Sequence, residues 1–192
     1  MKSKIYNCIQ NSVDNYNRLL LDDDLQNNIE IIVKKSIEAF QLDKKMLLCG
    51  NGGSAADAQH IAAELSGRFY TDRPPLYAEA LHVNSSYMTA VANDYGYERV
   101  FSRQIEALAK PGDIAIGIST GGSSTNVISA LKLAKELGCK AIGLSGKDGG
   151  KFNALCDVNL IAISEDTPRI QEMHILIGHT ICHLIDQAFN KA

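Results

Sequence analysis

The chain has 192 residues, 45% of them hydrophobic and 21% charged, and its 19 basic and 22 acidic side chains leave a net charge of −3. This composition is typical of a globular protein of one domain and excludes a disordered chain. The slightly acidic balance argues against a nucleic-acid binder. No apolar run approaches the ~20 residues of a membrane helix, and residues 1–7 lack the apolar core of a signal peptide. We therefore expect neither a nucleic acid nor a membrane as partner.

The cysteines favour a reducing compartment. They are odd in number and scattered, with no Cys-x-x-Cys pair. The five are Cys8, Cys49, Cys139, Cys156 and Cys182. We expect reduced thiols in a cytoplasmic protein.

The first forty residues have a helical pattern. Apolar side chains recur there at three- and four-residue steps, after acidic residues at 22–24. The repeating positions are Leu25, Ile29, Ile32, Val33, Ile37 and Phe40. Residues 1–41 are thus predicted to form two helices, an extension that packs on the domain or on a neighbouring subunit.

Short apolar runs then alternate with helical patterns. The five runs are 46–49, 76–83, 114–119, 141–145 and 158–163, with helical patterns after 54 and at 86–92, 99–109 and 126–137. A last helix is predicted over 167–189, with Thr167 as its N-cap and Pro168 in its first turn. The alternation predicts one α/β domain over 1–192, with a doubly wound, mostly parallel five-stranded sheet flanked by helices.

Two loops rich in Gly and Ser, 50–54 and 119–126, each follow a strand and lead into a helix. Ligands of open parallel sheets bind at such ends. In the second loop, free N–H groups and the helix dipole favour an anion. It also carries the hydroxyls of Ser119, Thr120, Ser123 and Ser124 but no lysine, so it indicates a phosphomonoester site rather than a Walker A loop. The alternative is a plain turn with an N-cap.

The first loop loosely fits a dinucleotide fingerprint, Gly50-x-Gly52-x-x-Ala55. No acidic residue closes a second strand about 20 residues further on, so a sugar-contacting turn is favoured over a nucleotide site.

His60 and Glu64 are four residues apart, so they share one face of the helix that follows the first loop. Such a pair can ligate a divalent metal or act as an acid–base couple; the alternative is a solvated pair. Ser54 and Asp57 are predicted to cap this helix.

The last helix carries three histidines, His174, His179 and His183. A hydrogen-bonded structural role is expected for any one of them. The spacing of His179 and His183 also allows them to act as paired ligands or to form a plain helix face.

Taken together, these motifs resemble those of the phosphoheptose isomerases, which are sugar isomerase (SIS) domain proteins. The resemblance rests on 49–54 (CGNGGS), 58–64 (AQHIAAE), 92–94 (AND), 118–122 (ISTGG), 145–150 (SGKDGG) and 169–174 (RIQEMH). It implies isomerisation of sedoheptulose 7-phosphate to D-glycero-D-manno-heptose 7-phosphate, toward heptose precursors of lipopolysaccharide or capsule. It also implies a homotetramer with one zinc ion per subunit.

The resemblance assigns residues to roles. The zinc ligands would be His60, Glu64, Gln171 and His179. The substrate contacts would be Asn51, Gly52, Gly53, Glu64, Asn93, Asp94, Ser119, Thr120, Gly121, Ser124 and Gln171. We expect Glu64 to move the carbon-bound proton and His179 to act as acid. Some members have Ser in place of Gly121 and an acidic residue in place of Pro168, so no catalytic role is assigned to position 168.

Helix geometry adds one expectation. Gln171 and His179 are eight residues apart, about 12 Å along a helix, so one of the two is predicted to come from a neighbouring subunit. Arg68 and Arg73 are expected to be surface charges, with contact to the substrate as the alternative. Residues 147–150 are expected to form a tight turn, with a place in the lining of the site as the alternative.

Two other classes remain as alternatives. One is a non-catalytic SIS module that binds a protein or senses a sugar phosphate, and the other is a nucleotide binder. Glu64 together with His179 favours the enzyme.

Overall fold

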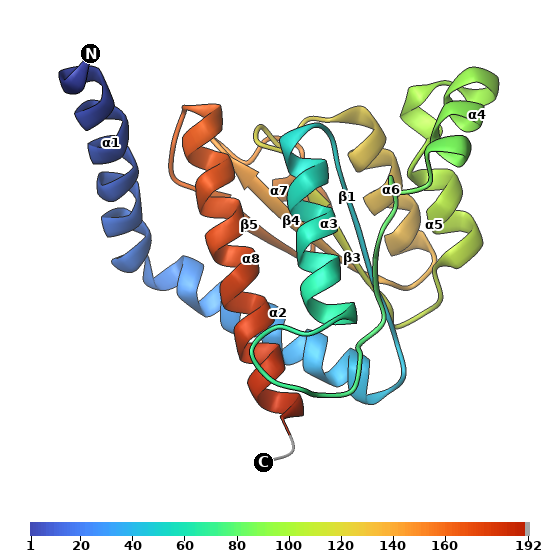
Figure 1. Cartoon of the computed structure of the whole chain (residues 1–192). Helices are drawn as coiled ribbons and strands as arrows, with labels where there is room; N and C mark the ends of the chain where they lie inside the picture. The colour runs from blue at the N-terminus through green and yellow to red at the C-terminus, as the bar shows by residue number, and fades with distance from the viewer. Residues whose placement is uncertain (191–192) are drawn as a thin grey trace.

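The five apolar runs form one parallel sheet in the computed structural model, which describes residues 1–190 (Figure 1). The strands are β1 (Met46–Gly50), β2 (Ala78–Ala80), β3 (Ile114–Ile118), β4 (Lys140–Gly146) and β5 (Val158–Ala162). Their order is β2-β1-β3-β4-β5, and every pairing is parallel. The predicted α/β sheet is confirmed, although β2 is much shorter than the run at 76–83 because only three of its residues pair with β1.

Nine helical segments, counted over the described residues, connect or flank the strands. They are α1 (Lys2–Leu20), α2 (Asp23–Gln41), α3 (Gly53–Ser66), α4 (Ser85–Tyr95), η1 (Tyr97–Arg99), α5 (Ser102–Leu108), α6 (Thr125–Glu136), α7 (Phe152–Leu155) and α8 (Thr167–Phe189). The pattern at 99–109 is split between the end of η1 and α5, and the short α7 was not predicted. The other helices lie close to where the sequence predicted them.

Alternate side chains of each strand point to opposite faces, so the sheet has a core on each side. Met46, Leu48 and Ile116 pack beneath α2, α3 and α8, whereas Leu47 and Ala115 pack beneath α4, α5 and α6. Near-continuous apolar strands are typical of parallel sheets that helices cover on both faces. The sheet is thus a rigid platform for the loops at its carboxyl edge.

Several helices do not begin where the sequence predicted. Asp22 does cap α2, since its carboxylate accepts the N–H of Leu25. Gly52 occupies the N-cap of α3, so Ser54 and Asp57 do not form the predicted cap. Asp166, not Thr167, occupies the N-cap of α8. In both places the chain enters the helix one or two residues before the predicted capping residue.

The N-terminal extension divides into two parts. α2 packs on the main core through Leu25, Ile29 and Ile32. α1 projects from the body beside the upper part of α8 (Figure 1), where Ser12 donates to Glu172 and Arg169 donates to the carbonyl of Cys8. Most of α1 is therefore exposed. Among residues 1–190, no helix combines the length and apolar character that a membrane span requires.

His174 attaches α8 to the end of β4. Its ring is fully buried (0% exposed), with Nε2 2.8 Å from the carbonyl oxygen of Ser145. Burial lowers the pKa of His174, although the bond to Ser145 opposes this shift. A neutral ring whose Nε2–H donates to Ser145 fits this environment, which confirms the structural role expected for one of the histidines.

The buried imidazole predicts a pH dependence of stability. Below its ordinary pKa of 6.5, His174 takes up a proton in the unfolded chain that it does not take up in the folded chain. The free energy of unfolding should therefore fall as the pH drops from about 7.5 to 5.5, by at most ~1.4 kcal/mol per pH unit from this group. His174→Gln, which keeps a donor for Ser145, should flatten the decline when urea unfolding is measured with a chelator present. Equal pH dependence in the two proteins would contradict this assignment.

Candidate active site

The strand order reverses between β1 and β3, and the two predicted ligand loops meet there. α3 leaves β1 on one face of the sheet, and α6 leaves β3 on the other. Such a reversal opens a crevice at the carboxyl edge, where open α/β sheets bind their ligands. The Asn51 and Asn126 amides join the two loops by a pair of hydrogen bonds, both 2.9 Å long. The tertiary structure thus brings together two loops that are about 70 residues apart.

A cavity of about 360 Å³ opens beside this amide pair. Its lining includes Asn51, Ser124 and Asn126 from the two loops, and Tyr97 and Glu98 from η1. The Tyr97 hydroxyl donates to the Asn51 side-chain oxygen over 3.3 Å. Polar groups therefore surround a space of the size that a small polar molecule needs.

The loop at 119–124, named here the phosphate turn, has the geometry of an anion site. The Ser119 and Ser124 hydroxyls lie 2.9 Å apart at its two ends. Ser124 is the N-cap of α6, but its side chain makes no capping bond. The positive end of the helix dipole and the hydroxyls therefore face the same small space. Thr120, Gly121 and Ser123 complete the turn, and Gly121 is partly exposed.

The turn after β4 packs against the backbone of the phosphate turn. The Lys151 N–H donates to the Gly122 carbonyl over 3.0 Å. Gly122 has φ +58°, and a Cβ there would lie 2.1 Å from the carbonyl oxygen of Gly149. Residues 147–150 thus form the predicted tight turn, with Gly149 and Gly150 also at positive φ. Two stretches of backbone meet here at a distance that no side chain permits.

His60, Glu64 and His179 converge on the opposite face of the domain from α6. Nε2 of His179 lies 2.9 Å from Nε2 of His60, which in turn lies 3.1 Å from Oε1 of Glu64. One ligand atom from each residue falls within 4.8 Å of the others. His60 is exposed, and Glu64 is half-buried with 24% of its side chain exposed. We refer to these three residues as the His–Glu–His cluster.

The cluster exists because α3 and α8 run side by side in the same direction (Figure 1). Gly178 allows the close approach, since a Cβ there would lie 2.6 Å from Cδ1 of Ile61. His179 directly follows Gly178 on α8, and His60 directly precedes Ile61 on α3, so the two histidines lie beside this contact. His183 does not pair with His179 as a ligand; its ring packs against Tyr70 instead, with centroids 5.0 Å apart.

The donors of the cluster suit a zinc ion. Two imidazole nitrogens and a carboxylate oxygen are ligands that Zn²⁺ prefers. Nitrogens bound to tetrahedral zinc lie roughly 3.3 Å apart, close to the separation of the two imidazoles here. The three residues of the cluster leave one position of a tetrahedral site for a further ligand.

Gln171 does not reach the cluster within its own chain. Its side chain packs on Gly53 at the start of α3, where a Cβ would lie 2.9 Å from Cδ of Gln171. Gly53 precedes His60 by seven residues, about 10 Å along the helix axis. The loop end of the site thus contains Gln171, Gly52 and Gly53, whereas the cluster lies about two turns further along α3.

The remaining predicted contacts are Asn93 and Asp94. Both are exposed in the last turn of α4, where the Asn93 amide donates to the Asp94 carboxylate over 2.8 Å. This position leaves their side chains available to a ligand but does not join them to either loop.

Three side chains near the two loops and the cluster were not predicted as part of the site. Asn126 and Tyr97 hold Asn51, as described above. Asp57 lies one turn before His60, and its Oδ2 is buried without a hydrogen-bond partner among the described residues. Burial raises the pKa of Asp57 to about 6. Nothing in the local sequence pattern separates these residues from ordinary surface or capping positions.

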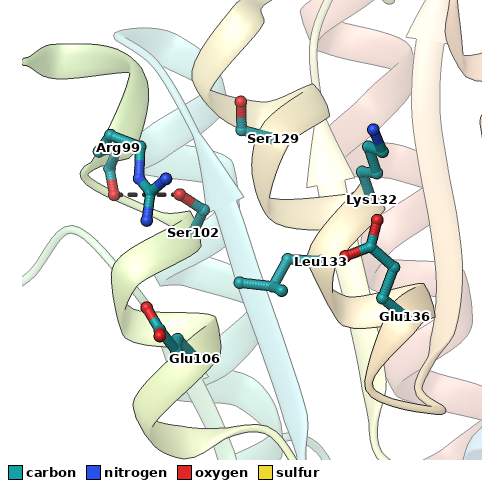
Figure 2. Close-up of a pocket in the computed structure, with 7 residues that line it drawn as sticks. All are labelled: Arg99, Ser102, Glu106, Ser129, Lys132, Leu133 and Glu136. Atoms are coloured by element: carbon teal, nitrogen blue, oxygen red, sulfur yellow. Dashed lines mark hydrogen bonds between the residues drawn. The ribbon is translucent and has the colours of Figure 1, made fainter.

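A second hollow, of about 280 Å³, lies between α5 and α6 (Figure 2). Figure 2 shows Arg99, Ser102 and Glu106 on one side and Lys132 and Glu136 on the other. The two cations and two carboxylates offset each other, so the hollow does not fit a phosphate dianion. None of the predicted site residues lines it.

Comparison with known proteins places this architecture in a class. The fold and the hydroxyl-rich turn are those of a SIS domain, and the SIS domain family model matches residues 13–146. The phosphoheptose isomerase of Aliarcobacter butzleri is 62% identical over 162 residues, which is 84% of this chain and 86% of that protein. The phosphoheptose isomerase of Clostridium acetobutylicum is 50% identical over 97% of this chain and 95% of its own.

Comparison with solved structures leads to the same family. The phosphoheptose isomerase of Neisseria gonorrhoeae has a TM-score of 0.91 and 40% identity, covering 97% of this chain and 98% of its own. The chain therefore belongs to the phosphoheptose isomerases, within the SIS domain family.

Two neighbouring glycines of the phosphate turn provide a matched test of its geometry. Gly122→Ala should lower the melting temperature and weaken binding of a sugar phosphate at least ~10-fold, because the new Cβ meets the Gly149 carbonyl. Gly121→Ala should melt like the wild type, since a Cβ at Gly121 has only the Ser123 hydroxyl nearby, at 3.6 Å. Thermal melts and calorimetric titration measure both effects. Equal melting temperatures for the two variants would contradict the backbone contact.

Proposed function

We propose that this phosphoheptose isomerase interconverts sedoheptulose 7-phosphate and D-glycero-D-manno-heptose 7-phosphate. The observation that carries the proposal is the convergence of His60, Glu64 and His179 in a domain that also has a phosphate turn at its switch point. A non-catalytic sugar-phosphate sensor needs the turn but has no use for the cluster. A nucleotide-binding function is not favoured, because the chain has no acidic residue at the end of a second strand about 20 residues after the first loop.

The phosphate turn would hold the substrate by its dianionic end. Ser119, Thr120 and Ser124 supply hydroxyl donors, and the first turn of α6 supplies the positive end of a dipole. Asn51, Gly52 and Gly53 of the first loop, with Gln171, are positioned to contact the sugar. Asn93 and Asp94 would contact it from α4.

The reaction moves a proton between C1 and C2, and Glu64 and His179 would carry it out. Glu64 would take the carbon-bound proton and return it to the neighbouring carbon, while His179 would exchange protons with the oxygens. A carboxylate held tightly by a metal is a weaker base, so Glu64 in this role requires a loose or changing bond to the metal. That requirement fits its half-buried, adjustable side chain.

The zinc site would be made by His60, Glu64, His179 and Gln171, with one ion per subunit. A bound zinc ion polarises a carbonyl and stabilises the negative charge that develops on its oxygen. One donor atom from each of the three residues of the cluster lies within 4.8 Å of the others. The carboxamide of Gln171 would come from a neighbouring subunit.

The separation of Gln171 from the His–Glu–His cluster along α3 and α8 supports a site shared between subunits. His179 lies beside His60 of its own chain, so Gln171 is the ligand that would come from a neighbour. The cluster also lies about two helical turns from the loops of its own chain. We therefore propose that the loops and Gln171 of one subunit face the His–Glu–His cluster of another.

α1 supports a homotetramer. Its exposed apolar side chains recur at three- and four-residue steps, which is the pattern of a helix that packs against a partner. They are Ile5, Ile9, Val13, Tyr16 and Leu20. A second copy of this chain would cover them and draw two sites together.

The setting would be the cytoplasm, on the route to heptose precursors of lipopolysaccharide or capsule. None of the five cysteines forms a disulfide, and burial raises the pKa of Cys49 and of Cys182 to about 12, so these thiols stay protonated and unreactive.

An assay with sedoheptulose 7-phosphate tests the proposed reaction. The protein should form the aldose phosphate, and a chelator should abolish activity that added zinc restores. Glu64→Gln should lower kcat by about 10²–10⁴-fold with little change in substrate binding, because the amide cannot accept the proton. Product analysis by NMR measures turnover, and calorimetric titration measures substrate binding. Turnover retained by Glu64→Gln would remove Glu64 from its role.

Mixed oligomers test the shared site. The variant Ser119→Ala/Ser124→Ala lacks the anion hydroxyls, and Glu64→Gln lacks the base, so each should be inactive alone. If one subunit's loops serve another's cluster, co-expression should restore up to about a quarter of the sites. If each chain forms its own site, every site in the mixture keeps one defect and no activity returns.

A further inference from the structure

Arg73 lies inside the protein, although the sequence predicted a surface charge. Its side chain is fully enclosed (0% exposed), and its Nε donates to Oδ1 of Asp186 over 3.1 Å. Asp186 is equally buried, at 1% exposed. Each charge therefore compensates the other, because an unpaired ion in this place would be very costly.

The other donors of Arg73 close the end of α3. Nη2 donates to the Glu64 carbonyl and Nη1 to the Leu65 carbonyl, each over 2.9 Å. The last carbonyls of a helix lack partners within the helix, and the negative end of its dipole favours a cation there. Arg73 is thus the C-terminal cap of α3, bonded to the backbone of the residue that we propose as base.

Asp186 connects this cap to α8. Its second oxygen accepts the backbone N–H and the hydroxyl of Thr71, over 3.1 and 2.9 Å. Asp186 follows His179 by seven residues, about two helical turns, so both lie on the same side of α8. In Figure 1 the loop after α3 passes across the lower part of α8. One buried ion pair therefore joins the Glu64 backbone to the side of α8 that carries His179.

We infer that Arg73, with Asp186 and Thr71, is a positioning residue that sets the alignment of Glu64 with His179. The inference rests on the proposed function, since it matters only if these two side chains act together. The planar guanidinium binds four partners at once, the Asp186 carboxylate and three backbone carbonyls, which a lysine cannot do. Loss of the pair would let α3 slide or tilt against α8 and spread the metal donors, without touching the phosphate turn.

Cys182 provides a local reporter of this alignment. It lies on α8 between His179 and Asp186, fully buried, with Sγ 3.9 Å from the Ile61 carbonyl of α3. Its labelling rate by a thiol reagent, resolved from the other cysteines by mass spectrometry, measures how often α3 and α8 separate.

A second buried ion pair provides the matched control. Lys45 Nζ lies 2.6 Å from Oδ2 of Asp113, whose side chain is 2% exposed. Asp113 also accepts the N–H groups of Lys45 and Lys110. This pair lies at the amino edge of the sheet, and the side-chain hydrogen bonds of Asp113 join it to Lys45 and Lys110 rather than to α3 or α8. Asp113→Asn therefore removes a comparable buried charge far from the cluster.

The experiment compares Arg73→Lys and Asp186→Asn with Asp113→Asn. Both variants of the Arg73 pair should bind zinc about 10–100-fold more weakly in competition with a chelator. They should label faster at Cys182 and lose kcat, with KM within about 3-fold, because the phosphate turn still holds the substrate. Asp113→Asn should lower the melting temperature while zinc affinity, Cys182 labelling and KM stay near wild type.

Thr71→Val is the milder variant if Asp186→Asn does not fold. It removes one bond to Asp186, and zinc affinity and Cys182 labelling should shift in the same direction by a smaller factor. Zinc affinity and labelling that change no more than in Asp113→Asn would overturn the inference. An inactive wild type that still shows these changes would instead overturn the proposed function, so the two failures are distinguishable.

Discussion

The close parallel contact between α3 and α8 is the constraint on which the site depends. Gly178 has no side chain at the point where Ile61 of α3 reaches α8, so the two helices approach closely enough for His60 and His179 to meet. The apolar contact sets how near the helices lie. The buried Arg73–Asp186 pair then sets how far one is displaced along the other. Packing and electrostatics thus restrict different degrees of freedom of the same pair of helices.

The sheet imposes the second constraint. Parallel strands end at one edge, and the reversal of strand order between β1 and β3 places the Asn51 and Ser119 loops around one crevice. The Asn51–Asn126 amide pair and the backbone contact at Gly122 then stiffen the crevice. An anion bound there meets donors that are already in place, so little conformational entropy is lost on binding. The two constraints act at different ends of α3, and this separation is the basis of our proposal that subunits share a site.

Much of the fold follows from local patterns. The three- and four-residue spacing placed α2, and the apolar runs placed all five strands, because burial on one helix face or inside a sheet selects those periodicities. Local patterns failed where the outcome depended on distant partners. Arg73 looks like a surface cation in sequence, and only the carbonyls of α3 and the carboxylate of Asp186 make its burial favourable. The helix starts at Gly52 and Asp166 likewise differ from those that the local pattern predicted.

The sequence alone determined the kinds of chemistry that the chain carries: a hydroxyl-rich anion turn, a His–Glu pair four residues apart, and a family resemblance over nearly the whole length. The first two features are short-range, and all three can be recognised from the order of residues alone. The tertiary structure decided which of them act together. It brought His179 to His60 and Glu64 across 119 residues of sequence and left Gln171 beside Gly53. The reason is physical, because the separation of two side chains on packed helices depends on the contacts between the helices, and no local pattern encodes those contacts.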